Sequence, residues 1–447
     1  MTRVYPARGA VLGFLLAVCL WGGGCIDHTT GGSHDPDGDG SPEALDGDIC
    51  VEDEEDLDAD NDADGPPSTP PWAITVIGTD YVSTSVSLIS RESRSLFREN
   101  IIHSGSSSPG LSVALSGDVV FPRTWNHKNW IVLLDRYPNS VLTFVDPNDF
   151  NVIGQLSVAT GFASNPHDFL WLWENKAYVT RYETNPRPGN EPYDGGDDIL
   201  IVDPVARTIT GRIPLAGYAD TAHHPQAQAR PDQMTYADGR VWVTLDHLTN
   251  DFEQSGEGRV VAIDPQTDEV VALVRLPEVT NCTGMAYNRH DHALYLSCSG
   301  LFVAGTEAQL THSGIVAIDL KADPPQARVV RRAQDGVGRP YGFDLDVAQG
   351  RHLLAVRFGD LETGIPDRLV AIDLETAEET VVHEAGSAYG MGGLLADDAT
   401  NTVYVGEADP ANPAIFLYVL KDGAFCRDGM MEAHPRVGLP PRHIRFY

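Results

Sequence analysis

Residues 176–215, KAYVTRYETNPRPGNEPYDGGDDILIVDPVARTITGRIPL, decide the fold. Three runs of β-branched, aromatic and aliphatic residues, at 176–182, 198–202 and 208–215, are separated by segments rich in Pro, Gly, Asn and Asp. Such runs bounded by turn residues indicate β-strands. The sequence HDFLWLW at 167–173 supplies one more strand just upstream. These residues therefore predict four antiparallel strands in about 50 residues.

The apolar run that closes on an aspartate recurs along the chain. It ends at intervals of 54 to 61 residues, at Asp146, Asp203, Asp264, Asp319 and Asp373. Runs at 85–90 and 414–420 extend the series to seven units. One four-stranded unit cannot bury both of its faces, so neighbouring units must stack, and seven of them close a ring. We predict an all-β fold over 72–447, a seven-bladed β-propeller of four-stranded antiparallel blades, with strands from both ends of the domain sharing one blade.

The segments KAYVTRYE and DDILIVDPVARTITGRIPL resemble the YVTN-repeat β-propellers, a bacterial and archaeal family of exported seven-bladed proteins. The resemblance covers roughly residues 110–420, because five units carry the same motif. It implies the fold and leaves the function open, since the motif residues pack blades and form turns. The aspartate that ends each run is expected to close a turn after the third strand of its blade.

The N-terminus has the features of a bacterial export signal. Two arginines precede an 11-residue apolar run at 10–20, which is too short to span a bilayer, and small residues then lead to Cys25. We predict a lipoprotein signal peptide at 1–24 and a lipid on Cys25. Gly22 stands where an aliphatic residue is usual, so ordinary secretion stays the alternative. Ile26 rather than Asp follows the cysteine, which favours the outer membrane, on the periplasmic side or the cell surface, with the lipid as the only membrane attachment.

Residues 25–71 are predicted to be a disordered, acidic, low-complexity tether. Residues 26–71 hold 16 of the 64 acidic residues and no Lys or Arg, and they contain too few large apolar side chains to form a core. The formal net charge of the whole chain is −33. A nucleic-acid partner is excluded, because it would need concentrated positive charge.

Two pieces of the tether have the D-x-D-x-D-G spacing of calcium loops. One contains Asp35, Asp37 and Asp39, and the other lies at 60–65. Alternating carboxylates before a glycine can surround a hard cation, but neither piece has the glutamate that an EF-hand loop carries at its twelfth position. A solvated spacer is the main interpretation and weak Ca²⁺ binding the alternative; no other cofactor is expected.

Four cysteines lie beyond the signal peptide and Cys25. Cys282 and Cys298 flank a predicted hairpin at equal distances from its midpoint, so they fall opposite each other on adjacent strands. Opposed cysteines in an exported protein are expected to form a disulfide. For Cys50 and Cys426, a second bridge and two free thiols both remain open.

Propellers bind ligands at the mouth of the central channel, in the loops that enter the innermost strand and leave the second one. The candidate ligand-binding residues in these loops are Arg123, His167, Arg181, Asp246, Tyr341, Arg357 and Glu407. Three arginines at matching positions of different blades favour a small anionic ligand. The alternative is that each arginine pairs with a neighbouring acid. The sequence contains no G-x-S-x-G, S-x-x-K or H-E-x-x-H motif for catalysis.

The sequence favours a monomeric, non-enzymatic binding or scaffold module of the cell envelope. Its expected partner is an envelope protein or polymer, or a small anionic ligand. The alternative is a metal-dependent, lactonase-like hydrolase with its site at the channel mouth, where His167, Asp246 and Glu407 are the first residues to test.

Overall fold

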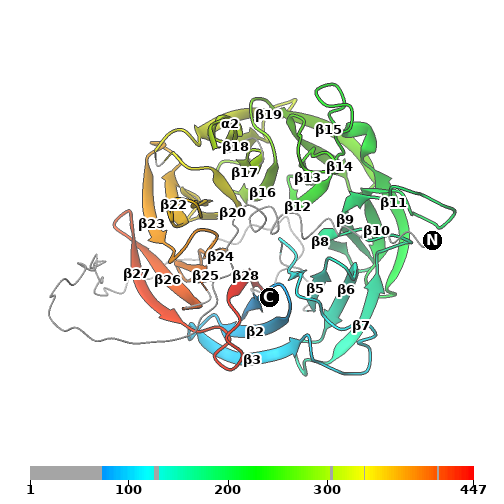
Figure 1. Cartoon of the computed structure of the whole chain (residues 1–447), viewed down its shortest axis with the longest axis horizontal. Helices are drawn as coiled ribbons and strands as arrows, with labels where there is room; N and C mark the ends of the chain where they lie inside the picture. Colours follow the sequence, from blue (N-terminus) through cyan, green and yellow to red (C-terminus); the bar gives the residue numbers. More distant parts are fainter. Residues whose placement is uncertain (1–72, 125–129, 303–305, 337, 410–411) are drawn as a thin grey trace, which may run out of the picture. The chain divides into compact units, whose positions relative to one another are not determined.

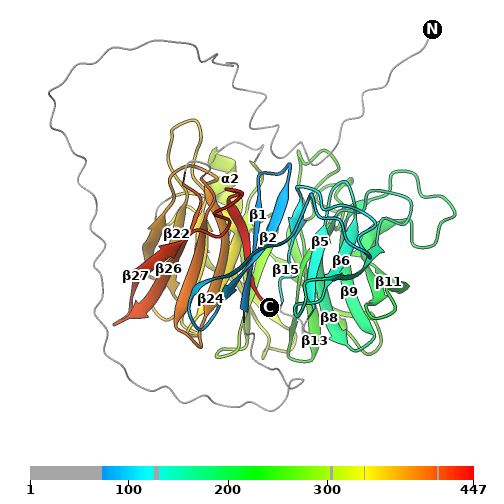
Figure 2. The same cartoon turned by 90° about the horizontal axis from the view of Figure 1, so that it is seen from below.

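The computed structural model describes residues 73–447 apart from 125–129, 303–305, 337 and 410–411. The strands of this part of the chain form seven four-stranded antiparallel sheets around a central axis (Figure 1). In the side view the sheets stand next to one another around this axis (Figure 2). The predicted seven-bladed β-propeller is confirmed.

Each blade is described from its innermost to its outermost strand. Blade 1 consists of β28 (Pro441–Phe446), β1 (Ala73–Thr79), β2 (Thr84–Ser90) and β3 (Ser95–His103). Blade 2 consists of β4 (Val119–Val120), β5 (Ile131–Asp135), β6 (Val141–Val145) and β7 (Val152–Ser157). Blade 3 consists of β8 (Pro166–Trp173), β9 (Lys176–Thr184), β10 (Gly196–Asp203) and β11 (Thr208–Pro214).

The other four blades follow in chain order. Blade 4 consists of β12 (Pro231–Ala237), β13 (Arg240–Leu245), β14 (Gly258–Asp264) and β15 (Glu269–Leu276). Blade 5 consists of β16 (Cys282–Asn288), β17 (Ala293–Ser299), β18 (Ser313–Asp319) and β19 (Gln326–Arg332). Blade 6 consists of β20 (Tyr341–Ala348), β21 (His352–Arg357), β22 (Arg368–Asp373) and β23 (Glu379–Glu384). Blade 7 consists of β24 (Met391–Asp397), β25 (Thr402–Glu407), β26 (Ala414–Lys421) and β27 (Ala424–Met431). Two short helices lie between strands, η1 (Ala216–Tyr218) and α2 (Thr306–His312).

The middle strands of a blade are buried on both faces, because each blade is covered by its two neighbours. In blade 4, β13 and β14 are buried almost throughout, whereas the outer strand β15 alternates between exposed and covered residues. One apolar cluster joins Trp242 and Val260 of blade 4 to Met285 and Leu294 of blade 5. The core is therefore a ring of layers between blades, as expected for stacked repeats.

Strands from the two ends of the propeller share blade 1, which closes the ring as predicted. The C-terminal strand β28 is the innermost strand and pairs antiparallel with β1. Ile74 lies opposite Phe446, and Val76 lies opposite Ile444. Because β28 and β1 come from opposite ends of the domain, their ladder holds both ends in one sheet and closes the ring of blades.

The aspartate that ends the recurring run forms a turn, as predicted. In all five units its Oδ1 accepts a hydrogen bond of 2.8–2.9 Å from the backbone N–H two residues later, at Asn148, Val205, Gln266, Lys321 and Glu375. Such a bond closes an Asx turn after the third strand of the blade.

The disulfide expected between Cys282 and Cys298 is present, and the two residues are paired on β16 and β17. Cys25, Cys50 and the calcium-loop candidates Asp35, Asp37 and Asp39 lie outside the described residues. Among the described helices, none combines the length and apolar character needed to cross a membrane.

Candidate functional site

The innermost strands of the propeller begin at one end of the axis, which we call the mouth. The end of the second strand of each blade lies at the same place, since Pro166 is paired with Arg181 and Pro231 with Leu245. His167 and Asp232 occupy the second position of β8 and β12. The adjacent blades 3 and 4 therefore bring a histidine and a carboxylate together at the mouth.

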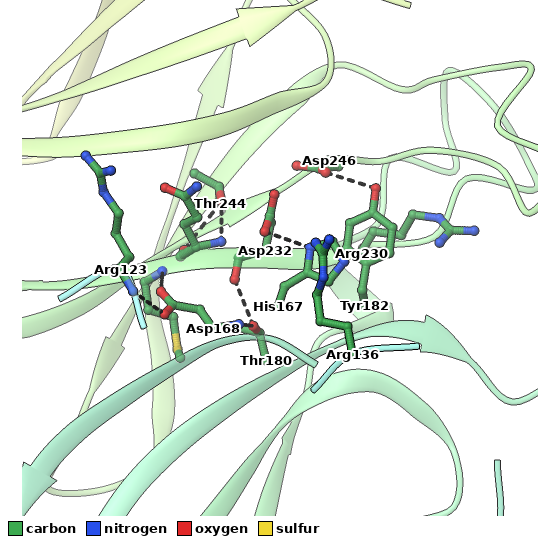
Figure 3. Close-up of polar contacts among 12 residues, drawn as sticks. Arg123, Arg136, His167, Asp168, Thr180, Tyr182, Arg230, Asp232, Thr244 and Asp246 are labelled. Carbon is green, nitrogen blue, oxygen red and sulfur yellow. Dashed lines mark hydrogen bonds and ion pairs between the residues drawn. The ribbon is translucent and has the colours of Figure 1, made fainter. Parts of the chain in front are cut away.

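Five residues of these two blades form the mouth cluster, namely His167, Tyr182, Arg230, Asp232 and Asp246 (Figure 3). His167 Nδ1 lies 2.8 Å from Asp232 Oδ1. The imidazole stacks on the Tyr182 ring, with 4.0 Å between centroids and 7° between planes. The Tyr182 hydroxyl donates a hydrogen bond to Asp246 Oδ2 at 3.0 Å. The Arg230 guanidinium lies over the Tyr182 ring, 4.9 Å from its centroid.

The histidine is fixed in orientation and still reaches solvent. Its ring is held on one face by Tyr182 and at Nδ1 by Asp232, while 14% of its side chain remains exposed. A carboxylate only accepts hydrogen bonds, so the proton of this pair sits on Nδ1 and Nε2 is the basic nitrogen. This is the arrangement of a histidine that can remove a proton from water.

The second carboxylate of the cluster, Asp246, lies in surroundings that favour its protonated form. Asp246 is 1% exposed, and burial together with the charge of Asp232 raises its pKa well above the usual value. Burial also raises the pKa of Tyr182, which therefore stays protonated and donates its hydroxyl hydrogen to Asp246.

Arg136, labelled in Figure 3, adds a positive charge to this side of the mouth, since it interacts electrostatically with Asp232. It follows β5 and bonds Asp118 Oδ1 through Nε at 2.9 Å, with 26% of its side chain exposed. Burial lowers the pKa of Arg136. The charge of Asp118, its hydrogen bond and the charge of Asp232 raise this pKa by more, so the net shift is upward. A permanent cation on this side of the mouth suits an anionic ligand or a developing oxyanion.

The sequence places Arg123, like Arg181 and Arg357, in a loop that leaves the second strand of its blade, and for Arg123 this is wrong. It follows the innermost strand β4, and Val119 pairs with Asp135, so the arginine at the predicted position is Arg136. The Arg123 side chain crosses the axis, where it donates to the carbonyl oxygens of Met285 in blade 5 and Leu345 in blade 6.

The backbone N–H of Arg123 belongs to a second buried group below the mouth. Asp168 accepts backbone hydrogen bonds from Arg123, Phe169 and Met234, at 2.7–2.8 Å. Burial raises the pKa of Asp168 to about 7 despite these donors. Asp168 thus links the segment 121–124 to β8 and β12.

Four of the predicted residues lie inside the sheets in polar contacts. Arg181 makes a bidentate pair with Asp198, both bonds being 2.7 Å. Arg357 lies 3.7 Å from the Tyr341 ring centroid, and both side chains bond Glu379.

In blade 7, Glu407 accepts a hydrogen bond from the N–H of Gly386 at 3.2 Å and lies 3.3 Å from His383 Nε2. The pairing of arginines with nearby acids, the alternative kept open by the sequence, describes Arg181 and Arg357. A ligand-binding role for these four residues stays a prediction.

Oxygens of the mouth cluster and of the adjacent blade 5 have capacity for further hydrogen bonds. Asp246 Oδ1, Thr283 Oγ1 and Ser297 Oγ are buried and have no hydrogen-bond partner in the described structure. A buried polar atom without a partner costs about 1–3 kcal/mol. A ligand with hydroxyl groups, or a bound water, would recover this free energy.

In the described part of the chain, one group of metal-ligating side chains has its ligand atoms within reach of one another, Asp220, His223 and Glu257. Asp220 Oδ1 accepts a hydrogen bond from Arg259 at 2.7 Å, and its Oδ2 accepts the Glu257 N–H at 2.8 Å. The group offers three ligand atoms, and the Arg259 guanidinium beside Asp220 opposes the binding of a cation there.

No protein-family model matches the chain, and no curated protein matches it. Solved structures do resemble it in fold. The periplasmic gluconolactonase of Pseudomonas aeruginosa is 12% identical, with a TM-score of 0.55 over 84% of this chain and 98% of that one. A Bacteroides fragilis protein with the provisional name 6-phosphogluconolactonase is 11% identical, with a TM-score of 0.54 over 86% and 100%. A hypothetical selenium-binding protein of Sulfolobus tokodaii is 10% identical, with a TM-score of 0.56 over 85% and 94%. At these identities the likeness establishes the propeller fold.

Proposed function

We propose that the chain is a lactonase-like hydrolase that opens cyclic esters at the mouth cluster. The His167–Asp232 pair carries the proposal, because it presents an oriented, partly exposed imidazole between two blades. Two of the structures with the same fold are named for lactone hydrolysis, which supports this choice over other hydrolytic reactions.

The residues of the mouth cluster suffice for a water-mediated mechanism. His167 Nε2 takes a proton from water as the water oxygen attacks the lactone carbonyl carbon, and Asp232 stabilises the imidazolium. Arg136 faces the negative charge that develops on the carbonyl oxygen. When the ring C–O bond breaks, the imidazolium returns its proton to the departing alkoxide, which gives a hydroxy acid. Asp246 and Thr283 offer free buried oxygens to substrate hydroxyl groups.

The hydrolase accounts for the mouth better than the scaffold expected from sequence. A scaffold would recognise its partner through the arginines at matching positions of the blades. Arg181 and Arg357, however, are 0% and 1% exposed and are paired with acids. A scaffold also gives no reason for the oriented His167 or for the unpartnered Asp246 oxygen. We further propose that the reaction takes place in the cell envelope, given the signal at 1–24 and the lipid expected on Cys25.

Steady-state kinetics of the purified full chain on δ-gluconolactone and simple γ-lactones test the proposal. We expect wild-type turnover above the rate in water, and Asp232→Asn should lower kcat/KM by about 10²–10⁴ because the imidazole loses its charged partner. The matched control is Asp238→Asn, which changes a surface His–Asp pair with His292 at 3.3 Å and should leave the rate unchanged. Background rates on every lactone would refute the proposal, and full activity of Asp232→Asn would refute this site.

A further inference from the structure

A second group of side chains at the mouth is aromatic. Phe302, Phe343, Phe358 and Tyr389 form a chain of ring contacts with centroid separations of 5.2–5.9 Å. We call them the aromatic group. Phe343 is the third residue of β20, Phe358 follows β21, and Tyr389 precedes β24. These are mouth positions, because Tyr341 is paired with Arg357 and Met391 with Glu407.

The aromatic group continues the ring of innermost strands that carries the mouth cluster. His167, Asp232 and Thr283 lie at the second position of β8, β12 and β16, in blades 3 to 5. Phe343 follows at the next innermost strand, β20 of blade 6, and its carbonyl oxygen packs against Gly284 of blade 5. Polar and aromatic sides therefore meet around one mouth.

The aromatic group is partly open to solvent. Tyr389 is 38% exposed, and Phe302 and Phe343 are half-buried. Their rings pack edge to face or tilted, with interplanar angles of 40–74°, which fixes them in place before any ligand arrives. A fixed, half-buried aromatic surface binds apolar groups at little cost in conformational entropy.

We propose that the aromatic group binds an apolar substituent of the substrate, so that the preferred substrates are lactones with an alkyl or aryl chain. This inference rests on the proposed lactone hydrolysis at His167. The polar side of the mouth holds the lactone ring, and the chain lies on Phe343 and Tyr389. A fully hydroxylated sugar lactone leaves these rings without an apolar partner and is expected to be a poorer substrate.

A homologous series tests the inference. Hydrolysis of γ-lactones with side chains of one to eight carbons is measured with the full chain. We expect kcat/KM to rise by about threefold per methylene until the surface is covered. A kcat/KM independent of chain length, with turnover present, would overturn the substrate class while leaving the hydrolase intact.

Two variants locate the effect. Phe343→Ala and Tyr389→Ser should each lower the ratio of kcat/KM between the longest and the shortest lactone by about tenfold, because the chain loses its aromatic partner. Tyr389 lies before β24 and is more exposed than Phe343. The Tyr389→Ser variant is therefore expected to fold and to test the aromatic group even if Phe343→Ala folds poorly. The control is Tyr236→Ala, a 46% exposed tyrosine near the other end of β12, which should leave the ratio unchanged.

Calorimetric binding separates this inference from the proposed reaction. Long-chain lactone is titrated into the His167→Asn variant, with and without Phe343→Ala. Affinity that grows with chain length and falls in the double variant supports the aromatic site even if no lactone is turned over. Equal affinity of both variants for long and short lactones would refute it.

Discussion

Replacing Asp198 by alanine tests whether Arg181 is a structural residue of blade 3. Both side chains are 0% exposed, and the carboxylate accepts two hydrogen bonds of 2.7 Å from the guanidinium. In the variant the guanidinium keeps the carbonyl oxygen of Tyr193 at 2.5 Å and that of Val158 at 3.4 Å. It is then a buried charge without a counterion.

Removing one partner of a buried ion pair costs about 3–5 kcal/mol. The remaining carbonyl acceptors around Arg181 place Asp198→Ala at the lower end, about 3 kcal/mol. The double variant Arg181→Met, Asp198→Leu should regain most of this, because two apolar side chains leave no charge to desolvate.

Unfolding of the full chain in guanidinium chloride, followed by tryptophan fluorescence, measures the difference in the free energy of unfolding. A variant that shifts the midpoint concentration at an unchanged slope has changed in stability. The control is Arg351→Ala, which breaks a surface pair with Asp373 in which the arginine is 49% exposed, and which should cost less than about 1 kcal/mol. An Asp198→Ala variant as stable as this control would contradict the structural role and restore Arg181 as a ligand-binding candidate.

Two further predictions concern stability. The Cys282→Ser, Cys298→Ser variant should lose about 3 kcal/mol in urea unfolding, because the bridge closes a loop with a sequence separation of 16; equal stability would show that the bridge does not constrain the unfolded chain. His434 should make the fold sensitive to acid, since burial lowers its pKa to about 4 while the unfolded chain takes up the proton at about 6.5. Its contribution is present above pH 6.5 and is lost as the pH falls towards 4, by about 1.4 kcal/mol per pH unit. The stability of His434→Asn should therefore fall less between pH 6.5 and 4 than that of the wild type, and parallel curves would contradict this.

The fold was predictable because its signals are local and repeated. The Asp203 turn and the runs at 176–182 and 198–202 coincide with β9 and β10 of blade 3, and their counterparts recur in the other blades. Closure by β28 followed from the need to complete blade 1 and join the two ends of the ring. The order of strands in blade 2 was predicted wrongly, because residues 121–124 leave the sheet and carry Arg123 to Met285 and Leu345, contacts that no local pattern contains.

The site was predicted only in part, because side-chain direction changes at every residue of a strand. His167 and Asp246 lie in the mouth cluster, but the sequence favoured Arg181, whereas its neighbour Tyr182 contacts His167. A shift of one residue exchanges the two faces of a strand, and irregular pairing between Pro166 and Phe169 adds to the uncertainty in register. Asp232 had a usable signal, since Pro231-Asp232 matches Pro166-His167 in the preceding blade.

The most direct test of lactone hydrolysis at the mouth cluster compares kcat/KM for one lactone among the wild type, His167→Asn and His292→Asn. His167 is the oriented histidine of the mouth cluster, and His292 belongs to an exposed pair with Asp238 in which it is 41% exposed. We expect a loss of at least about a hundredfold in His167→Asn and none in His292→Asn. Equal rates for all three proteins would show that the mouth cluster is not a hydrolytic site.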